Sequence, residues 1–120
     1  MKAATAVSAL ALTVGGMAAT AAPAEAVGGC PSGKLCLYRG TNYSDLFFTM
    51  ASTQACLPIN HGGGRPLSYV NNLPVEVKMW GYEAGFPYHT ATIRAGGFSS
   101  SAGGSTYSWL DACTGGVVPN

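Results

Sequence analysis

The sequence has little charge of either sign. Charged residues make up 9% of its 120 positions, against about 25% in ordinary globular proteins. Six cations and five acids leave a net charge of +1. Such a surface lacks the basic patch that binds nucleic acids or acidic lipids. We therefore expect neither partner, and we expect solubility to depend on small polar side chains and exposed backbone.

Side chains suited to catalysis are also scarce. The chain has two histidines, His61 and His89, and it has neither a G-x-S-x-G elbow nor an H-E-x-x-H pair. One histidine lies in a glycine-rich segment and the other begins a predicted strand, where a solvated side chain is the usual state. We expect no enzymatic activity, no cofactor and no metal. A zinc site of Cys30, Cys36, Cys56 and His61 is disfavoured by its uneven spacing.

The first 26 residues are typical of a secretory leader. Lys2 supplies the positive charge, a run of small apolar residues follows, and Ala24-Glu25-Ala26 offers a cleavage site. A membrane anchor is the alternative, but Thr, Ser and Gly dilute the apolar run. We predict a signal peptide over residues 1–26. The mature chain, residues 27–120, is then secreted, has no membrane anchor and is long enough for a single domain.

All four cysteines follow the predicted leader. An even number in a small secreted chain indicates disulfides rather than free thiols. Three pairings are possible, but Cys30 and Cys36 flank a Pro-Ser-Gly turn, which favours a bond between them and leaves Cys56 for Cys113. Closing the longer loop stabilises the fold by about 4 kcal/mol in the chain-entropy model, against about 2 for the shorter one. We expect the longer bridge to be the main clamp.

Short apolar segments alternate with glycine- and proline-rich turns along the mature chain. The predicted strands cover residues 35–38, 46–50, 67–70, 75–80, 89–93 and 107–112. Residues 51–59 fit either a helical turn or a short strand. The glycine-rich segments 60–64 and 95–104 are predicted to be loops, the first of them mobile. This spacing of short strands favours an all-β sandwich or barrel.

Two motifs occur twice, in the same order. The hairpin of residues 35–50 returns over residues 78–93 with one inserted residue, and residues 64–71 are echoed by residues 104–111. The hairpin alignment equates Leu37, Tyr38 and Tyr43 with Met79, Trp80 and Phe86. Two such units in the same order predict a duplicated fold with two similar halves.

The first unit resembles a known family. The run CPSGKLCLYRGTNYSD, followed by a strand, a glycine loop, L-S-Y-V-N-N and a second aromatic hairpin, resembles the secreted actinobacterial proteins grouped as peptidase inhibitor family I36. The resemblance covers residues 30–113. It implies a disulfide-stabilised, βγ-crystallin-like Greek-key sandwich, in which two duplicated four-stranded motifs pack face to face.

Both units depart from the βγ-crystallin pattern, in which a glycine follows two spaced aromatic residues. After Tyr38 and Tyr43 this position holds Asp45, and Asp tolerates left-handed backbone better than most residues do. In the second unit the position holds Tyr88, so we expect a distorted arch there. We expect Phe86 to be the core aromatic residue of this second arch.

The calcium-binding positions that many βγ-crystallin domains carry are degenerate here. They correspond to Gly64, Arg65, Ser68, Gly104, Ser105 and Ser108. Glycine and arginine replace the oxygen ligands that calcium prefers, and the arginine would repel the ion. We expect no calcium site, and we expect Ser68 and Ser108 to hydrogen-bond their own turns.

Inhibitory members of the family block metallopeptidases with a stiff loop in the second arch, held by its own short disulfide. The corresponding residues here are Tyr82, Glu83, Ala84, Gly85, Phe86, Pro87 and Tyr88. This segment has no cysteine, although its proline supplies some rigidity and its phenylalanine could enter an apolar pocket. The resemblance therefore implies a secreted inhibitor with a secreted protease as its partner, and we expect a monomer.

Two other functions stay open, a cell-wall or carbohydrate-binding module, which the aromatic residues suggest, and a killer-toxin-like antimicrobial protein on the same fold. Flat rings stack on sugar faces, and the candidates are Tyr38, Tyr43, Tyr69, Trp80, Tyr82, Tyr88, Tyr107 and Trp109. Most of them alternate along predicted strands, which favours a place in the core. We expect Tyr82 and Tyr88 to be the most exposed.

Overall fold

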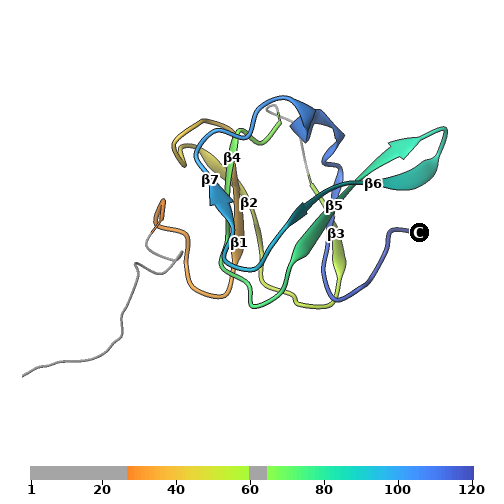
Figure 1. The fold of residues 1–120 in the computed structure, drawn as a ribbon, viewed down its shortest axis with the longest axis horizontal. Helices are drawn as coiled ribbons and strands as arrows, with labels where there is room; N and C mark the ends of the chain where they lie inside the picture. Colours follow the sequence, from red (N-terminus) through yellow and green to blue (C-terminus); the bar gives the residue numbers. More distant parts are fainter. Residues whose placement is uncertain (1–26, 60–64) are drawn as a thin grey trace, which may run out of the picture.

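The computed structural model describes residues 27–59 and 65–120 (Figure 1). The predicted leader, residues 1–26, and the predicted mobile loop, residues 60–64 with His61 and Gly64, lie outside the described residues. In the described ranges, no helix is long and apolar enough to cross a membrane.

Over these ranges the chain folds into eight β-strands and a short 3-10 helix. The strands are β1 (Leu35–Tyr38), β2 (Leu46–Met50), β3 (Cys56–Pro58), β4 (Ser68–Asn71), β5 (Val77–Glu83), β6 (Phe86–Ile93), β7 (Phe98–Ser99) and β8 (Asp111–Cys113). The helix η2 spans Ser105–Ser108. The first hairpin, β1 and β2, has the predicted bounds, and the ambiguous segment 51–59 contains only the short strand β3.

The strands form two four-stranded antiparallel sheets, with the orders β2-β1-β4-β7 and β3-β8-β5-β6. Strands β1 to β4 of the first half correspond to β5 to β8 of the second half. Exchanging every strand for its counterpart converts one order into the other, read in the opposite direction. Each half therefore keeps three strands in its own sheet and contributes its third strand to the other sheet, so that β7 lies beside β4 (Figure 1). This arrangement confirms the predicted Greek-key sandwich of two duplicated motifs.

The strand register also supports the duplication. In the first hairpin the register shifts between Leu37 and Tyr38. In the second it shifts between Met79 and Trp80. These are the residues that the sequence alignment equates, so the irregularity recurs at the same place in both halves.

The echo between residues 64–71 and 104–111, in contrast, is misaligned. The Leu67 N–H donates to the Tyr38 carbonyl at 2.8 Å, and in the other half the Leu110 N–H donates to the Trp80 carbonyl at 2.8 Å. The structural counterpart of Leu67 is therefore Leu110, whereas the echo equates it with Tyr107. The predicted strand 107–112 is wrong because η2 occupies its first part, and only Asp111–Cys113 pairs with β5.

The predicted loop 95–104 is also interrupted by a strand. Phe98 pairs with Val70, and Ser99 pairs with Tyr69. The local sequence is rich in glycine and serine and carries no strand signal, so the edge of β4 determines this pairing. Pairing with an existing sheet edge overrides weak local preferences.

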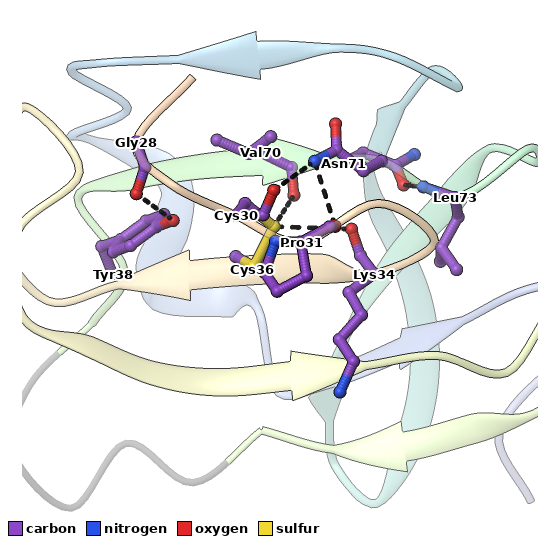
Figure 2. The surroundings of a disulfide bond; sticks show 10 residues. Gly28, Cys30, Pro31, Lys34, Cys36, Tyr38, Val70, Asn71 and Leu73 are labelled. Carbon is purple, nitrogen blue, oxygen red and sulfur yellow. Dashed lines mark hydrogen bonds between the residues drawn. A yellow bond between two sulfur atoms is a disulfide. The ribbon is translucent and has the colours of Figure 1, made fainter. Parts of the chain in front are cut away.

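The core lies between the two sheets. Its buried side chains come from both halves, and they are Leu35, Leu37, Met50, Ile59, Leu73, Val77, Met79, Ile93, Trp109 and Ala112. A second cluster, Cys30, Cys36, Tyr38 and Val70, covers the other face of β1 and β4. The segment that precedes β1 closes this cluster, and the Tyr38 hydroxyl donates to the Gly28 carbonyl at 3.4 Å (Figure 2).

Both disulfides have the pairing that the sequence favours. Cys30 is bonded to Cys36, which fastens the N-terminal segment to β1 (Figure 2). Cys56 is bonded to Cys113 and joins β3 to β8. Because all four cysteines are in disulfide bonds, the zinc site considered from the sequence would have no free thiolate as a ligand. The second bond fixes a strand of the first half covalently in the sheet of the second half.

Candidate functional site

The β5–β6 hairpin is longer than its counterpart in the first half. Its strands have 7 and 8 residues, against 4 and 5 for β1 and β2. Buried residues alternate with exposed or half-buried ones along β5 as far as Gly81, after which Tyr82 and Glu83 are both exposed. The tip of the hairpin therefore projects beyond the core (Figure 1).

A two-residue turn closes this hairpin. Ala84 and Gly85 both have positive φ angles, 53° and 84°, which is the signature of a type I′ turn. Glu83 pairs with Phe86, and Tyr82 pairs with Pro87. The predicted distorted arch over residues 82–88 is thus a tight hairpin, because the strand pairing continues to the turn itself.

Phe86 is the most exposed large apolar side chain of the described residues, with 73% of its surface accessible. The expectation that it is the core aromatic of a second arch is wrong. Its counterpart Tyr43 folds back instead, and its ring lies edge-on to Tyr38 with 5.9 Å between the ring centroids. The two halves therefore differ most at the tip of the hairpin.

A buried hydroxyl group joins the backbone hydrogen bonds that hold the first arch closed. Ser68 Oγ donates to the Gly40 carbonyl at 2.6 Å and accepts the Tyr43 N–H at 3.1 Å. The backbone of Asp45 is left-handed, with φ of 60°, as predicted for the residue at the glycine position. The expectation that Ser68 bonds its own turn is wrong, because the register places it opposite Tyr38, beside this arch.

In the second half an aspartate occupies the equivalent position. Asp111 lies opposite Trp80, as Ser68 lies opposite Tyr38. Its carboxylate accepts a hydrogen bond from the Tyr82 hydroxyl. This hydrogen bond, followed by partial burial and the negative charge, raises the pKa of Tyr82 above the ordinary 10.0. The aspartate therefore anchors the extended hairpin at Tyr82, where the hairpin leaves the core, whereas the serine helps to close an arch.

The η2 segment packs closely against the same hairpin. A Cβ atom at Gly81 would lie 2.7 Å from the Ser108 carbonyl oxygen and 3.1 Å from the Tyr88 ring, so only glycine fits at this crossing. The Tyr88 hydroxyl lies 3.5 Å from Ser108 Oγ. Contacts from β8 and η2 therefore support the hairpin on both faces of its base.

The two tyrosines expected to be exposed are indeed accessible, Tyr82 by 37% and Tyr88 by 41%. Tyr82 pairs with Pro87, and Tyr88 pairs with Gly81, one step along the ladder. Because neighbouring positions of a strand point to opposite faces, the two rings lie on opposite sides of the ribbon. They do not form one flat surface.

The remaining degenerate calcium positions are occupied in other ways. The Arg65 guanidinium stacks over the exposed Tyr107 ring at 4.0 Å from its centroid. Gly104 has φ of 80° and precedes η2, which begins at Ser105. Ser108 approaches Tyr88 rather than its own turn. Within residues 27–59 and 65–120, no three His, Cys, Asp or Glu side chains are grouped to hold a metal ion.

His89 on β6 lies beside an aromatic ring and a hydroxyl group. Its exposed ring lies 5.6 Å from the Trp80 ring, and its Nε2 atom lies 2.8 Å from the Thr92 hydroxyl. His61 lies outside the described residues. No pocket is found in the part of the chain that the structure describes, and its most exposed large apolar side chain is that of Phe86 at the hairpin tip.

Comparison with known proteins points to one family. The family model described as peptidase inhibitor family I36 matches residues 23–90, which is more than half of the chain. The matched range contains the first half of the fold, the Cys30–Cys36 bond and the whole tip of the β5–β6 hairpin. No curated protein and no solved structure matches the chain.

Proposed function

The chain belongs to peptidase inhibitor family I36, and from this premise we propose that it is a secreted inhibitor of an extracellular metallopeptidase. Members of this family are not enzymes. The contact with the peptidase is made by the tip of the β5–β6 hairpin, residues 82–88. The observation that carries this proposal is the exposure of Phe86, which directly follows a two-residue turn.

The hairpin has the stiffness that an inhibitory loop needs. A rigid loop loses little conformational entropy when it binds, so more of its contact energy appears as affinity. Strand pairing extends to the turn, and the Tyr82–Asp111 hydrogen bond fixes the base. We infer that these contacts replace the short disulfide that this segment lacks.

Phe86 supplies the apolar anchor. Burying a phenylalanine side chain contributes about 1.5–3 kcal/mol, and 73% of this one is still accessible. Placing it in an apolar pocket of the peptidase should therefore contribute about 2 kcal/mol, or roughly a 30-fold change in affinity.

The test is an inhibition assay with the oxidised mature protein at micromolar concentration, against a thermolysin-like metallopeptidase and a subtilisin-like peptidase. We expect slower hydrolysis by the metallopeptidase, and inhibition about 30-fold weaker for Phe86→Ala. Phe98→Ala is the matched control, because Phe98 is also exposed, by 51%, but lies on β7 in the other sheet. Full peptidase activity with the wild-type protein present would contradict the proposal.

The wall-binding and antimicrobial alternatives find less support. Tyr82 and Tyr88 face opposite sides of the hairpin, so they cannot stack together on one sugar surface. Retention on cell-wall glycan without effect on any peptidase would favour the first alternative. Growth inhibition by the purified protein would favour the second.

We also propose that the chain is exported, that residues 1–26 are removed, and that residues 27–120 form a single monomeric domain. The two disulfides support this proposal, because such bonds persist in oxidising compartments. N-terminal sequencing of the protein from culture medium should begin at Val27. Sedimentation should give the mass of one mature chain.

A further inference from the structure

Pro87 follows the exposed Phe86 on β6, which is an edge strand of its sheet. The pair Glu83–Phe86 closes the two-residue turn and is therefore a hydrogen-bonded pair of the ladder. The next pair, Tyr82–Pro87, is then a non-hydrogen-bonded one, and an N–H group at position 87 would point outwards from the hairpin. Proline has no such group.

The backbone on the two sides of Phe86 differs. Before it, Ala84 and Gly85 are left-handed, with φ of 53° and 84°, so the chain cannot continue as an extended strand in that direction. After it, Pro87 and Tyr88 belong to β6 and are extended. An enzyme that binds chains as an added strand can therefore follow the tip only from Phe86 onwards.

This asymmetry indicates how a peptidase would bind the tip. The pocket for the apolar side chain must lie on the C-terminal side of the bond that the enzyme cuts, as in thermolysin-like metallopeptidases. The bond placed at the catalytic centre is then Gly85–Phe86. The residue after Phe86 would normally donate its backbone N–H to the enzyme.

We propose that Pro87 makes the tip a slowly cleaved bait for endopeptidases that cut before large apolar residues. Phe86 fills the pocket as a substrate side chain does, while Pro87 withholds the N–H donor that would align the Gly85–Phe86 bond for attack by water. The inference rests on the proposed inhibitory function and adds to it the reason that the inhibitor survives its target.

The test compares wild-type protein with Pro87→Ala in the presence of a thermolysin-like peptidase. Hydrolysis would add one water molecule across the Gly85–Phe86 bond, giving a new carboxylate on Gly85 and a new amine on Phe86. Because Cys56 and Cys113 lie on opposite sides of this bond, the oxidised protein would gain the mass of one water. The two fragments would separate only after reduction.

We expect the tip of Pro87→Ala to be cut about tenfold faster than that of the wild type, the factor that one backbone hydrogen bond contributes. Inhibition should fade as the cut accumulates. Pro58→Ala is the matched control, since Pro58 is an exposed proline on β3, the opposite edge strand of the same sheet. It should be cut at Gly85–Phe86 no faster than the wild type.

A double variant, Phe86→Ala with Pro87→Ala, separates recognition from unfolding. It should resist cleavage, because the anchor is missing. If the double variant were cut as fast as Pro87→Ala, cleavage would reflect local unfolding, and the inference would be overturned. A Pro87→Ala tip that stays intact would also overturn it.

A reporter substrate measured in parallel separates the two proposals. If the wild type fails to slow the peptidase but only Pro87→Ala is cut, the inhibitory function fails and the role of Pro87 stands. If wild type and Pro87→Ala inhibit equally and stay intact, inhibition stands and the role of Pro87 fails.

Discussion

Asn71 connects the two sheets through one buried amide. It lies on β4, yet its Nδ2 donates to the carbonyls of Ile93 and Arg94 at the end of β6, at 3.2 and 3.0 Å, and to that of Val75 at 3.1 Å. Its Oδ1 accepts the Leu73 N–H at 3.0 Å (Figure 2). All of these backbone groups would lose a partner if the amide were removed.

We expect Asn71→Ala to lower the free energy of unfolding by about 3 kcal/mol, because buried polar groups left without partners are costly. Asn72→Ala is the control. The amide of Asn72 bonds only the Cys30 and Pro31 carbonyls, which the neighbouring disulfide already positions, so its loss should cost less than about 1 kcal/mol. Denaturant unfolding of the oxidised proteins measures both, and equal losses would contradict this account.

Tyr82 should respond to alkaline pH. Its pKa is raised above 10.0, first by the hydrogen bond to Asp111. A pKa that is higher in the folded state means that the bond stabilises the fold below the ordinary pKa of 10.0, and that this stabilisation is lost as pH rises through the raised value. The base of the hairpin should therefore loosen only in strongly alkaline solution.

Asp111→Asn removes the carboxylate and should return the pKa of Tyr82 towards 10.0. The absorbance of tyrosinate during an alkaline titration measures the pKa of Tyr82. Tyr82→Phe lacks the titrating hydroxyl and so identifies the part of the absorbance change that belongs to this residue. Tyr38 also has a raised pKa, chiefly because it is buried and secondly because of Tyr43, and it should titrate identically in both variants. An unchanged Tyr82 titration in Asp111→Asn would show that the carboxylate is not its partner.

The anchoring residues were the hardest to find from the sequence. The echo of the two units equates Ser68 with Ser108, since both are serines before an aromatic residue. The strand register shows that Asp111 is the true counterpart of Ser68. A hydrogen-bond partner is fixed by three-dimensional pairing, which a shift of a few residues between repeats conceals.

At the scale of elements, the turn of the β5–β6 hairpin carries local strain. Ala84 is left-handed, with φ of 53°, which costs about 1 kcal/mol for a residue with a Cβ atom. Asn-Gly is the preferred sequence for this turn type. We expect Ala84→Asn to stabilise the protein by roughly 0.5–1 kcal/mol.

Thermal unfolding of Ala84→Asn, compared with Ala95→Asn, tests this expectation. Ala95 is also exposed, but it is not among the left-handed residues of the described chain, so the control should change stability little. Equal effects of the two substitutions would mean that the turn is not strained.

How well an element could be predicted depended on where its stabilising contacts lie. The hairpin of β1 and β2 was predicted with its observed bounds, because its apolar residues and its turn are adjacent in sequence. The two residues of β7 and the start of η2 were missed, since β7 forms only against the edge of β4. The exposed state of Phe86 was missed because an aromatic residue in a repeat normally signals core.

At the scale of the whole molecule, the exchange of third strands makes the two halves interdependent. The Cys56–Cys113 bond holds β3 in the sheet of the second half, and its sequence separation is 57, against 6 for Cys30–Cys36. A longer closed loop restricts the unfolded chain more strongly.

We expect Cys56→Ala with Cys113→Ala to lower stability by about 4 kcal/mol, and Cys30→Ala with Cys36→Ala to lower it by about 2 kcal/mol. Denaturant midpoints of the two double variants provide the comparison. A larger loss from the shorter loop would show that packing of the N-terminal segment, rather than restriction of the unfolded chain, dominates.

The duplicated architecture could be predicted from the sequence as a whole, since repeated aromatic and apolar positions imply repeated strands. The functional divergence of the halves could not. It involves a serine that bonds the backbone of one arch and an aspartate that bonds Tyr82 of the other hairpin, and the two residues occupy equivalent places in their strands.

The most direct test of the central claim is hydrogen exchange of the inhibitor alone and in complex with the thermolysin-like metallopeptidase. The exchange rates of the amides in residues 82–88 are compared with those in the equivalent arch, residues 39–45. We expect protection on binding at the hairpin tip and none at the closed arch. Protection confined to the arch, or unchanged exchange at the tip in an inhibited complex, would contradict the account.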